Sequence, residues 1–366
     1  MKLMLRALLA ASLTLPVVLA PPTADAFMQR PANEAQNFTA GLALIQNEKH
    51  AEAFDIFATL LPLGSGDAAY LMGMMKIQEL GVDYDPVGSL ALLKAAHEWG
   101  ARSAADVIAQ IEPHLSAEEF AQAEQQSAQY LDALQISFRN ERFAGEAISR
   151  EATRRAQPEF PERHIHEGNH GWMDLILGID SRGRIMAAQP LNNADRRHVR
   201  AFNQVAPRWR FEPNDSVTIQ TLRFNYTINP QNEEELIADI QQGFNNSLQL
   251  ANAGVTEQQM RLGGLTQYWL ANEPAAAERL PTPLYWYERA ARNGNVLAQR
   301  YLAINEAQVE WAEYLIAKGD LDVMVWHGMR LVTETNDAEQ QARGKKLIDD
   351  AGRAGHQVAR DFLRHI

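Results

Sequence analysis

The sequence predicts an α+β protein that is predominantly α, with helical-hairpin solenoid segments on both sides of a small β-β-α-β domain. Apolar residues recur at helical spacing from residue 37 to about 136 and again after about 232. Between these stretches the apolar period becomes two, which is typical of strands. The 366 residues suffice for two or three domains.

The first helical stretch shows the spacing and end signals of paired helices. Phe38 and Leu42 share one helical face. From Gly64 to Ala109, small residues predict places where facing helices approach closely; they are Ala68, Ala69, Gly73, Ala95, Ala96 and Gly100. Asp85-Pro86 predicts an inter-helix turn, and Ser116 to Glu119 predicts a capping box.

Similar signals return in the C-terminal third. Thr256 to Gln259 predicts a second capping box, and Thr282 followed by Pro283 predicts a helix start. One predicted helix of the first stretch and two of the C-terminal third end in a pair of small residues shortly before a glycine. The pairs are Ala95-Ala96 before Gly100, Ala290-Ala291 before Gly294, and Ala351-Gly352 before Gly355. These segments resemble Sel-one-like repeats, the tetratricopeptide-related helical hairpins, and the resemblance implies a protein-binding scaffold without chemistry.

The central stretch predicts a small sheet crossed by one helix. Gly171 to Ile179 alternates as a half-buried strand, Asp180 to Gly183 is a turn, and 184 to 189 forms the return strand. A helix follows, with Asp195 as its candidate N-cap, and its Val199, Phe202 and Val205 share a face. The last strand runs from 217 to 228. Trp209 and Phe211 point to one side and are expected to fill the core between helix and sheet.

Several motifs of this stretch, taken in order, resemble the C-terminal domain of the TonB family. They are Pro158-x-Phe160-Pro161, Gly171, Ile179-Asp180-x-x-Gly183, the Trp209-x-Phe211-x-Pro213 signature, and Phe224-Asn225-Tyr226. The resemblance covers about residues 155 to 230 and implies that the last strand offers an edge to an extended peptide. On that basis Leu222, Arg223, Phe224, Asn225 and Tyr226 form the partner-binding edge strand. The alternative is that a neighbouring helix or a second copy of the protein covers this edge.

The N-terminus predicts export. Lys2 and Arg6 precede an apolar run from Ala7 to Ala20, and Ala24-Asp25-Ala26 then forms a small-x-small cleavage pattern. We expect a signal peptide cleaved after Ala26, a periplasmic protein, and a Gram-negative host; an uncleaved anchor is the alternative. Membrane association is expected only if this segment is retained.

The composition excludes several classes of function. The chain has no cysteine, so it has no disulfide framework, thiolate nucleophile or thiolate metal ligand. A net charge of -12 disfavours nucleic acid as a partner. We expect no cofactor and no catalytic residue. His164, His166, Glu167 and His170 could in principle hold zinc, but their spacing fits no closed zinc pattern, and we expect surface histidines and no metal.

The predicted segments, in order, are the signal peptide (1-26), N-terminal helical repeats (34-136), a connector (137-154), the TonB C-terminal-like domain (155-230) and C-terminal helical repeats (231-366). Two hypotheses follow. The first is a periplasmic, non-enzymatic adaptor that binds protein partners of the cell envelope through the edge strand and the helical repeats. The second is a TonB-like transport-coupling protein that keeps its anchor and acts on an outer-membrane receptor, although the chain lacks the proline-rich spacer of such proteins.

Overall fold

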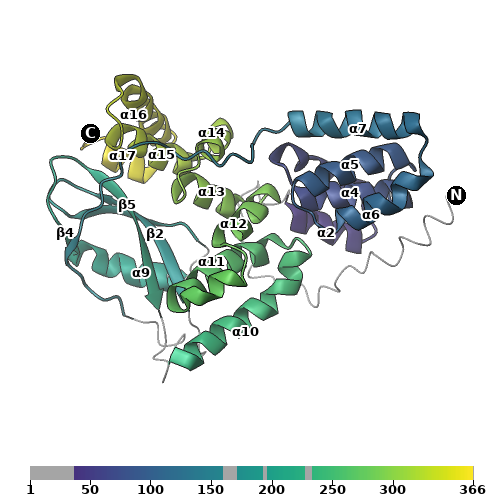
Figure 1. Ribbon diagram of the computed structural model, residues 1–366. Coiled ribbons are helices and arrows are strands. Elements are labelled where there is room, and N and C mark those ends of the chain that lie inside the picture. Colours follow the sequence, from purple (N-terminus) through teal and green to yellow (C-terminus); the bar gives the residue numbers. More distant parts are fainter. Residues whose placement is uncertain (1–36, 160–170, 193–195, 227–232, 366) are drawn as a thin grey trace. The chain divides into compact units, whose positions relative to one another are not determined.

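The computed structural model describes residues 37 to 159, 171 to 192, 196 to 226 and 233 to 365 (Figure 1). The described chain is mostly helical with a small antiparallel sheet, as the sequence predicts. It divides into two compact units, and each unit draws on two separate stretches of the sequence. Unit 1 comprises residues up to Phe138 together with Ile240–Val296; unit 2 comprises Arg139–Asp239 and Leu297–Ile366. The helical stretch after residue 231 is therefore shared between both units.

Unit 1 is built from helices alone in its described part. In chain order these are α2 (Phe38–Gln46), α3 (His50–Ala58), the 3-10 turn Leu61–Leu63, α4 (Gly66–Gln78), α5 (Pro86–Glu98), α6 (Ala104–Ile111), the 3-10 turn Glu112–His114, α7 (Ala117–Asp132), most of α10 (Glu233–Asn252), α11 (Thr256–Asn272), the 3-10 turn Pro274–Glu278 and α12 (Pro283–Arg292). Helix α4 packs on α5, α5 on α7, and α11 on α12.

The small residues of α4 and α5 allow these two helices to pack closely. A Cβ added to Gly73 would lie 2.8 Å from the Leu93 side chain and 3.1 Å from the Ser89 carbonyl oxygen. Ser89 Oγ donates to the Gly73 carbonyl across the same contact, at 2.7 Å. The predicted turn between these helices is confirmed, because Asp85 caps α5 by accepting from the Gly88 N–H at 2.8 Å. The Ser116 capping box at the start of α7 is also confirmed.

Two details of the helical prediction are wrong. Gly100 has no atom within 4 Å of an added Cβ, so it serves no close approach between helices; its φ of 91° shows that it ends α5 in the left-handed region. The predicted capping box at Thr256 does not form, because Val255 is the N-cap of α11 and has no side-chain cap. The Thr256 hydroxyl lies 3.2 Å from the Thr39 hydroxyl instead.

The three glycines of the repeated pattern share one backbone geometry. Gly100, Gly294 and Gly355 all have positive φ, and the residue after each donates its N–H to a carbonyl five positions back, at 2.8 to 3.0 Å. This is the Schellman ending of a helix, for which glycine is favoured because it lacks a Cβ. Gly254 and Gly319 end α10 and α14 in the same way. The pattern therefore marks chain reversals from one helix to the next.

Unit 2 combines a sheet with helices. Its elements are β1 (Ala152–Arg154), β2 (Gly171–Ile179), β3 (Ile185–Pro190), α9 (Arg196–Val205), the 3-10 turn Ala206–Arg208, β4 (Arg210–Phe211), β5 (Thr218–Tyr226), α13 (Val296–Ile304), α14 (Val309–Ala317), α15 (Leu321–Thr333), α16 (Ala338–Arg353) and α17 (Gln357–Phe362). Strands β3, β2 and β5 form an antiparallel sheet in that order, and β1 pairs with β4.

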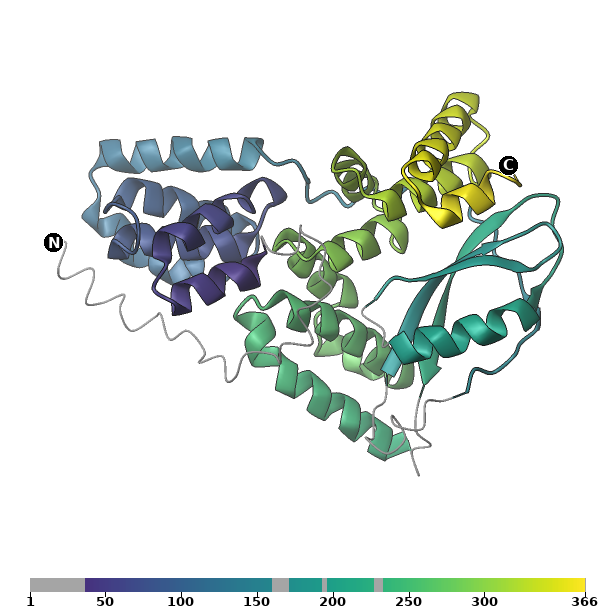
Figure 2. The ribbon, with the colours of Figure 1, turned by 180° about the vertical axis from the view of Figure 1, so that it is seen from behind.

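The two faces of the sheet pack against different helices (Figures 1 and 2). Met173, Leu175 and Leu177 alternate onto the face that α9 covers with Phe202 and Val205. On the opposite face, the Phe362 ring of α17 lies directly against Gly178, where a Cβ would collide with it. Trp326 of α15 packs on Phe362, with ring centroids 5.4 Å apart. The sheet is thus buried on both faces by helices that belong to the same unit.

Candidate functional site

The predicted partner-binding strand is β5, and it lies at one edge of the three-stranded sheet. Its register with β2 places Leu222 opposite Leu175 and Phe224 opposite Met173. Among the described residues, the backbone of β5 hydrogen-bonds only to β2. In an antiparallel pair, every second residue of an edge strand directs its N–H and C=O away from the neighbouring strand. An added strand would pair with these outward N–H and C=O groups.

The start of β5 lies beneath another segment. The Glu146 N–H donates to the Glu334 carbonyl at the end of α15 (2.9 Å), and the Arg150 N–H donates to Gln220 Oε1 (3.0 Å). Because α15 and Gln220 lie on opposite faces of the sheet, the segment from 146 to 150 crosses the β5 edge near Thr218 and Gln220. Arg150 fastens this crossing, since its guanidinium donates to the Asp180 carbonyl and to Thr218. The edge from Leu222 onward lies beyond the crossing.

The side chains of this edge divide between the two faces. Leu222 and Phe224 pack against the α9 core, and Phe202 and Phe224 have ring centroids 6.4 Å apart. Arg223 points to the other face, where its Nε and Nη2 donate to the two oxygens of the Asp174 carboxylate, both at 2.7 Å. Of the last two predicted residues, Asn225 and Tyr226, only the backbone pairing with β2 is described.

Asp174 was not identified from the sequence. Its side chain is only 7% exposed, and the Arg223 guanidinium lies 5.8 Å from the Trp172 ring as well. The alternation of β2 shows that Asp174 faces away from the α9 core, but its partner depends on the register between two strands almost 50 residues apart. The ion pair fixes Arg223, so Arg223 supports the strand and is not free to extend towards a partner.

The aromatic signature lies in the core of unit 2, as predicted. Trp209 and Phe211 are 4% and 3% exposed, and their ring centroids are 6.1 Å apart. Trp209 Nε1 donates to the Ala156 carbonyl at 2.9 Å, which satisfies the one polar atom of a buried indole. Pro213, the third signature residue, is exposed and follows β4.

The β2–β3 turn is fastened to the same core. Gly183 has φ of 79°, and its carbonyl accepts from the Phe211 N–H at 2.8 Å. Asp180 Oδ1 accepts from the N–H groups of Arg182 and Arg184. Burial by itself raises the pKa of Asp180, but these hydrogen bonds and the Arg184 guanidinium outweigh it and hold the pKa below its usual value. The turn residues therefore have a structural role.

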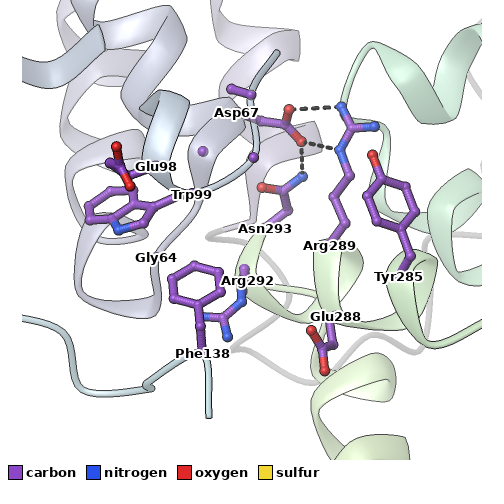
Figure 3. Close-up of a pocket in the computed structure, with 13 residues that line it drawn as sticks. Gly64, Asp67, Glu98, Trp99, Phe138, Tyr285, Glu288, Arg289, Arg292 and Asn293 are labelled. Carbon is purple, nitrogen blue, oxygen red and sulfur yellow. Dashed lines mark hydrogen bonds and ion pairs between the residues drawn. The ribbon is translucent and has the colours of Figure 1, made fainter. Parts of the chain in front are cut away.

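Unit 1 contains a second candidate site, a pocket of about 250 Å³ (Figure 3). At its base, the Asp67 carboxylate at the start of α4 accepts two hydrogen bonds from Arg289 of α12, both at 2.8 Å. Asn293 Nδ2 donates to the same carboxylate at 2.6 Å, and Asn293 also bonds Ser65 and Gln259. We call Ser65, Asp67, Gln259, Arg289 and Asn293 the Asp67 network.

Asp67 and Arg289 each stabilise the ionised form of the other. Burial by itself raises the pKa of Asp67, yet the Arg289 guanidinium and the amide donors outweigh it and lower that pKa. Burial likewise opposes the charge of Arg289, but Asp67 keeps its pKa above the ordinary value. Both groups stay ionised, and they are bonded to each other.

On another side of the pocket, Arg292 holds the segments around Leu63 and Ser137 by hydrogen bonds. Its guanidinium donates to the carbonyls of Leu63, Ile136 and Ser137 and lies 3.7 Å from the centroid of the Phe138 ring. Figure 3 shows this ring stacked over Arg292, away from the Asp67 network. Since the arginines and Asp67 are bonded to protein groups, we assign them to holding two stretches of the sequence together.

Several predictions fall outside the described residues: the cleavage residues Ala24 and Ala26, Phe160 and Pro161 of the first motif, the histidine cluster from His164 to His170, the candidate helix cap Asp195, and the end of the last strand at 227 and 228. Within the described ranges, no group of three or more His, Cys, Asp or Glu side chains could hold a metal ion. Across those same ranges, every helix is too short or too polar to cross a bilayer. The chain matches no family model, no curated protein and no solved structure.

Proposed function

We propose that the protein is a non-enzymatic adaptor of the bacterial periplasm that captures an extended segment of a partner protein on the β5 edge. The observation that carries this proposal is the position of β5 at the end of the sheet, with backbone bonds only to β2 in the described chain. Main-chain hydrogen bonds supply the affinity in strand addition, and alternate side chains supply selectivity.

The structural context supports this use of the edge. Both faces of the sheet are covered by helices of unit 2, so the sheet is held rigidly while one row of backbone groups is presented. A rigid edge loses little conformational freedom when a partner strand is added. The segment from 146 to 150 crosses only the start of β5, which supports a partner site on the part from Leu222 onward.

The helical hairpins of unit 1 add a scaffold for a further protein contact. Tyr285 is 43% exposed beside the pocket of Figure 3, and Phe138 is 44% exposed. Aromatic side chains that are exposed and anchored are common at protein interfaces. These two residues are the parts of unit 1 where we expect a partner to touch the helices.

Site-specific photo-crosslinking in cells tests the proposal. Thr221 is exposed on β5, and Ser181 is also exposed, on the β2–β3 turn of the same unit. A photoreactive phenylalanine at 221 is expected to capture a protein that the probe at 181 does not capture. Adducts at 221 confined to this chain would show that the edge is covered internally, and the proposal would fail.

The identity of the captured protein and the mature N-terminus separate the two hypotheses. A soluble envelope protein, together with a chain that begins after Ala26, supports the adaptor. An outer-membrane protein, together with a retained N-terminal segment, supports transport coupling instead. Mass spectrometry of the adduct and of the purified chain measures both.

A further inference from the structure

The pocket of Figure 3 lies where two helices of unit 1 end. Trp99 and Gly100 border it at the end of α5, and Arg292 and Asn293 border it at the end of α12. The C-terminal end of a helix carries a partial negative charge and favours a cation nearby. The start of α4 also borders the pocket, but Asp67 in its first turn opposes the positive charge of that helix end.

Glu98 gives the pocket a carboxylate that a ligand can reach. Three carboxylates and two guanidinium groups line the pocket, so its side chains have a balance of one negative charge. Asp67, Glu288, Arg289 and Arg292 each interact with another protein group. Glu98 is exposed, and its carboxylate has no bond to any residue that the structure describes. We call this site the Glu98 pocket.

Aromatic rings form much of the remaining lining. Trp99, Phe138 and Tyr285 border the Glu98 pocket, and the last two are 44% and 43% exposed. The face of an aromatic ring attracts a cation, because the ring carries negative charge on its faces. Phe138 already shows this kind of contact, since the Arg292 guanidinium lies 3.7 Å from its ring centroid. Exposed rings beside a free carboxylate therefore favour an organic cation.

Trp99 indicates that the occupant also carries a hydrogen-bond acceptor. Its side chain is 8% exposed, and its Nε1 has no hydrogen-bond partner within the described ranges. Figure 3 shows this nitrogen on the side of the indole towards Phe138. A buried indole N–H normally has an acceptor. The backbone carbonyl groups of a peptide are acceptors of this kind, so a basic residue within a peptide matches both Glu98 and Trp99.

The volume of the pocket and the charge around it agree with such an occupant. The volume of about 250 Å³ is below the roughly 300 to 1,000 Å³ of sites that take a whole small molecule, and it suits one side chain. Residues 37 to 138 hold 14 aspartates or glutamates and four lysines or arginines, whereas residues 240 to 296 hold four of each. The field of unit 1 therefore attracts a basic partner.

We infer that the Glu98 pocket binds a lysine or arginine side chain of a partner protein. The inference rests on the proposed contact of a partner with unit 1, and it adds the charge that the partner brings to that contact. The cation pairs with Glu98 and lies against Tyr285, and a carbonyl group of the partner's main chain accepts from Trp99. An acidic or wholly apolar segment gains no such ion pair.

A pair of short peptides tests the inference on the full chain. The probe is a serine-lysine-serine tripeptide with both ends capped, and its match carries norleucine, which has the same length but no charge. NMR follows the Trp99 indole N–H, which is assigned by its loss in Trp99→Phe. This signal is expected to shift on titration, with a dissociation constant at least about fivefold lower for the lysine peptide. No shift, or equal dissociation constants, would overturn the inference.

Two charge-removing variants locate the binding. Glu98→Gln should weaken binding of the lysine peptide about threefold or more. Glu118→Gln removes the same charge from an exposed residue of α7 outside the pocket, and it should leave the dissociation constant unchanged at 0.15 M salt, where distant charges are screened. Equal weakening by both variants would show unspecific attraction and would sink the pocket assignment. Unchanged circular dichroism confirms that both variants are folded.

This test is independent of capture on β5. If the lysine peptide does not bind while the probe at 221 still captures a partner, the inference on the Glu98 pocket fails and the proposed function stands. If the peptide binds with the expected selectivity while 221 captures nothing, the pocket stands and strand addition fails.

Discussion

The two units join distant stretches of the chain by opposite means. In unit 1, Asp67 and Arg289 are 222 positions apart and meet through charge-assisted hydrogen bonds. In unit 2, the sheet meets the C-terminal helices largely through apolar contacts, such as the Phe362 ring of α17 against Gly178 of β2, besides the hydrogen bond from Trp326 to Gln189. A polar junction concentrates its stabilisation in a few mutually dependent groups, whereas an apolar core distributes it over many contacts. The units should therefore respond differently to single substitutions and to pH.

The largest effect is expected from Arg289→Met, which leaves the Asp67 carboxylate without its cation. Removing one partner of a largely buried ion pair should lower the free energy of unfolding by about 3 to 4 kcal/mol. Denaturant unfolding measures this, with Arg261→Met, on an exposed residue of α11, as the control. The double variant Asp67→Leu/Arg289→Met should lose less than the single variant. A double variant that loses more would contradict the role of Asp67 as a stranded charge.

The second effect is a loss of stability in mild acid, confined to unit 2. Burial lowers the pKa of His327 to about 4 from 6.5, and Glu313 only partly opposes this, while Arg343 and Arg330 add to it. Below pH 6.5, His327 is protonated in the unfolded chain but stays neutral in the folded chain. The free energy of unfolding therefore falls as the pH drops towards 4. The total loss is about 3 kcal/mol.

Hydrogen exchange at several pH values measures this loss element by element. Between pH 6.5 and 4, α15 should lose protection while α4 keeps it. The lowered pKa of Asp67 makes unit 1 lose stability only at lower pH, as the carboxylate protonates below its ordinary pKa of 3.8. His327→Gln should abolish this fall in the stability of α15; Glu334 at the end of the helix, whose pKa burial raises, contributes the opposite sign in the same window. A fall that persists in that variant would assign the effect to another group.

The smallest effect concerns one hydrogen bond within the apolar core. Trp209→Phe retains a buried ring but loses the donor to the Ala156 carbonyl. Trp99→Phe in unit 1 is the control variant, because the buried Nε1 of Trp99 has no hydrogen-bond partner among the described residues. Thermal unfolding should show that Trp209→Phe costs about 1 kcal/mol more than Trp99→Phe. Equal costs would mean that the bond at Trp209 adds nothing beyond packing.

Local sequence signals predicted much of the fold. The alternation of 171 to 179 and the helical face of Val199, Phe202 and Val205 appear in the structure as β2 and α9. Trp209 and Phe211 were predicted as core from their spacing alone and are buried. The signal of α9 succeeds because a helix that is buried on one side records that burial in its own periodicity, whereas the strand predicted as half-buried is buried on both faces from Met173 to Ile179.

The junctions were not predictable in the same way. Arg150 bonds groups from the β2–β3 turn and β5, and Arg289 bonds a carboxylate from α4, yet neither arginine belongs to a local pattern. Their partners follow only from the pairing of segments far apart in sequence. Gly100 shows a related limit, because glycine satisfies both close packing and a left-handed helix end, and the sequence does not distinguish them.

The division of unit 1 into two stretches has a consequence for folding. During synthesis, the residues before Phe138 are made long before those of α11 and α12. Asp67 and Ser65 therefore have no hydrogen bonds to Arg289 and Asn293 during that interval. Closing such a long loop is slow, and the uncompensated polar surface of α4 stays hydrated until then. Residues 139 to 239 emerge in the interval, and they too lack the helices that later cover one face of their sheet. Unit 1 can finish folding only after Val296 has been made, and unit 2 only after the helices that follow it, so both units are completed late in synthesis and one after the other.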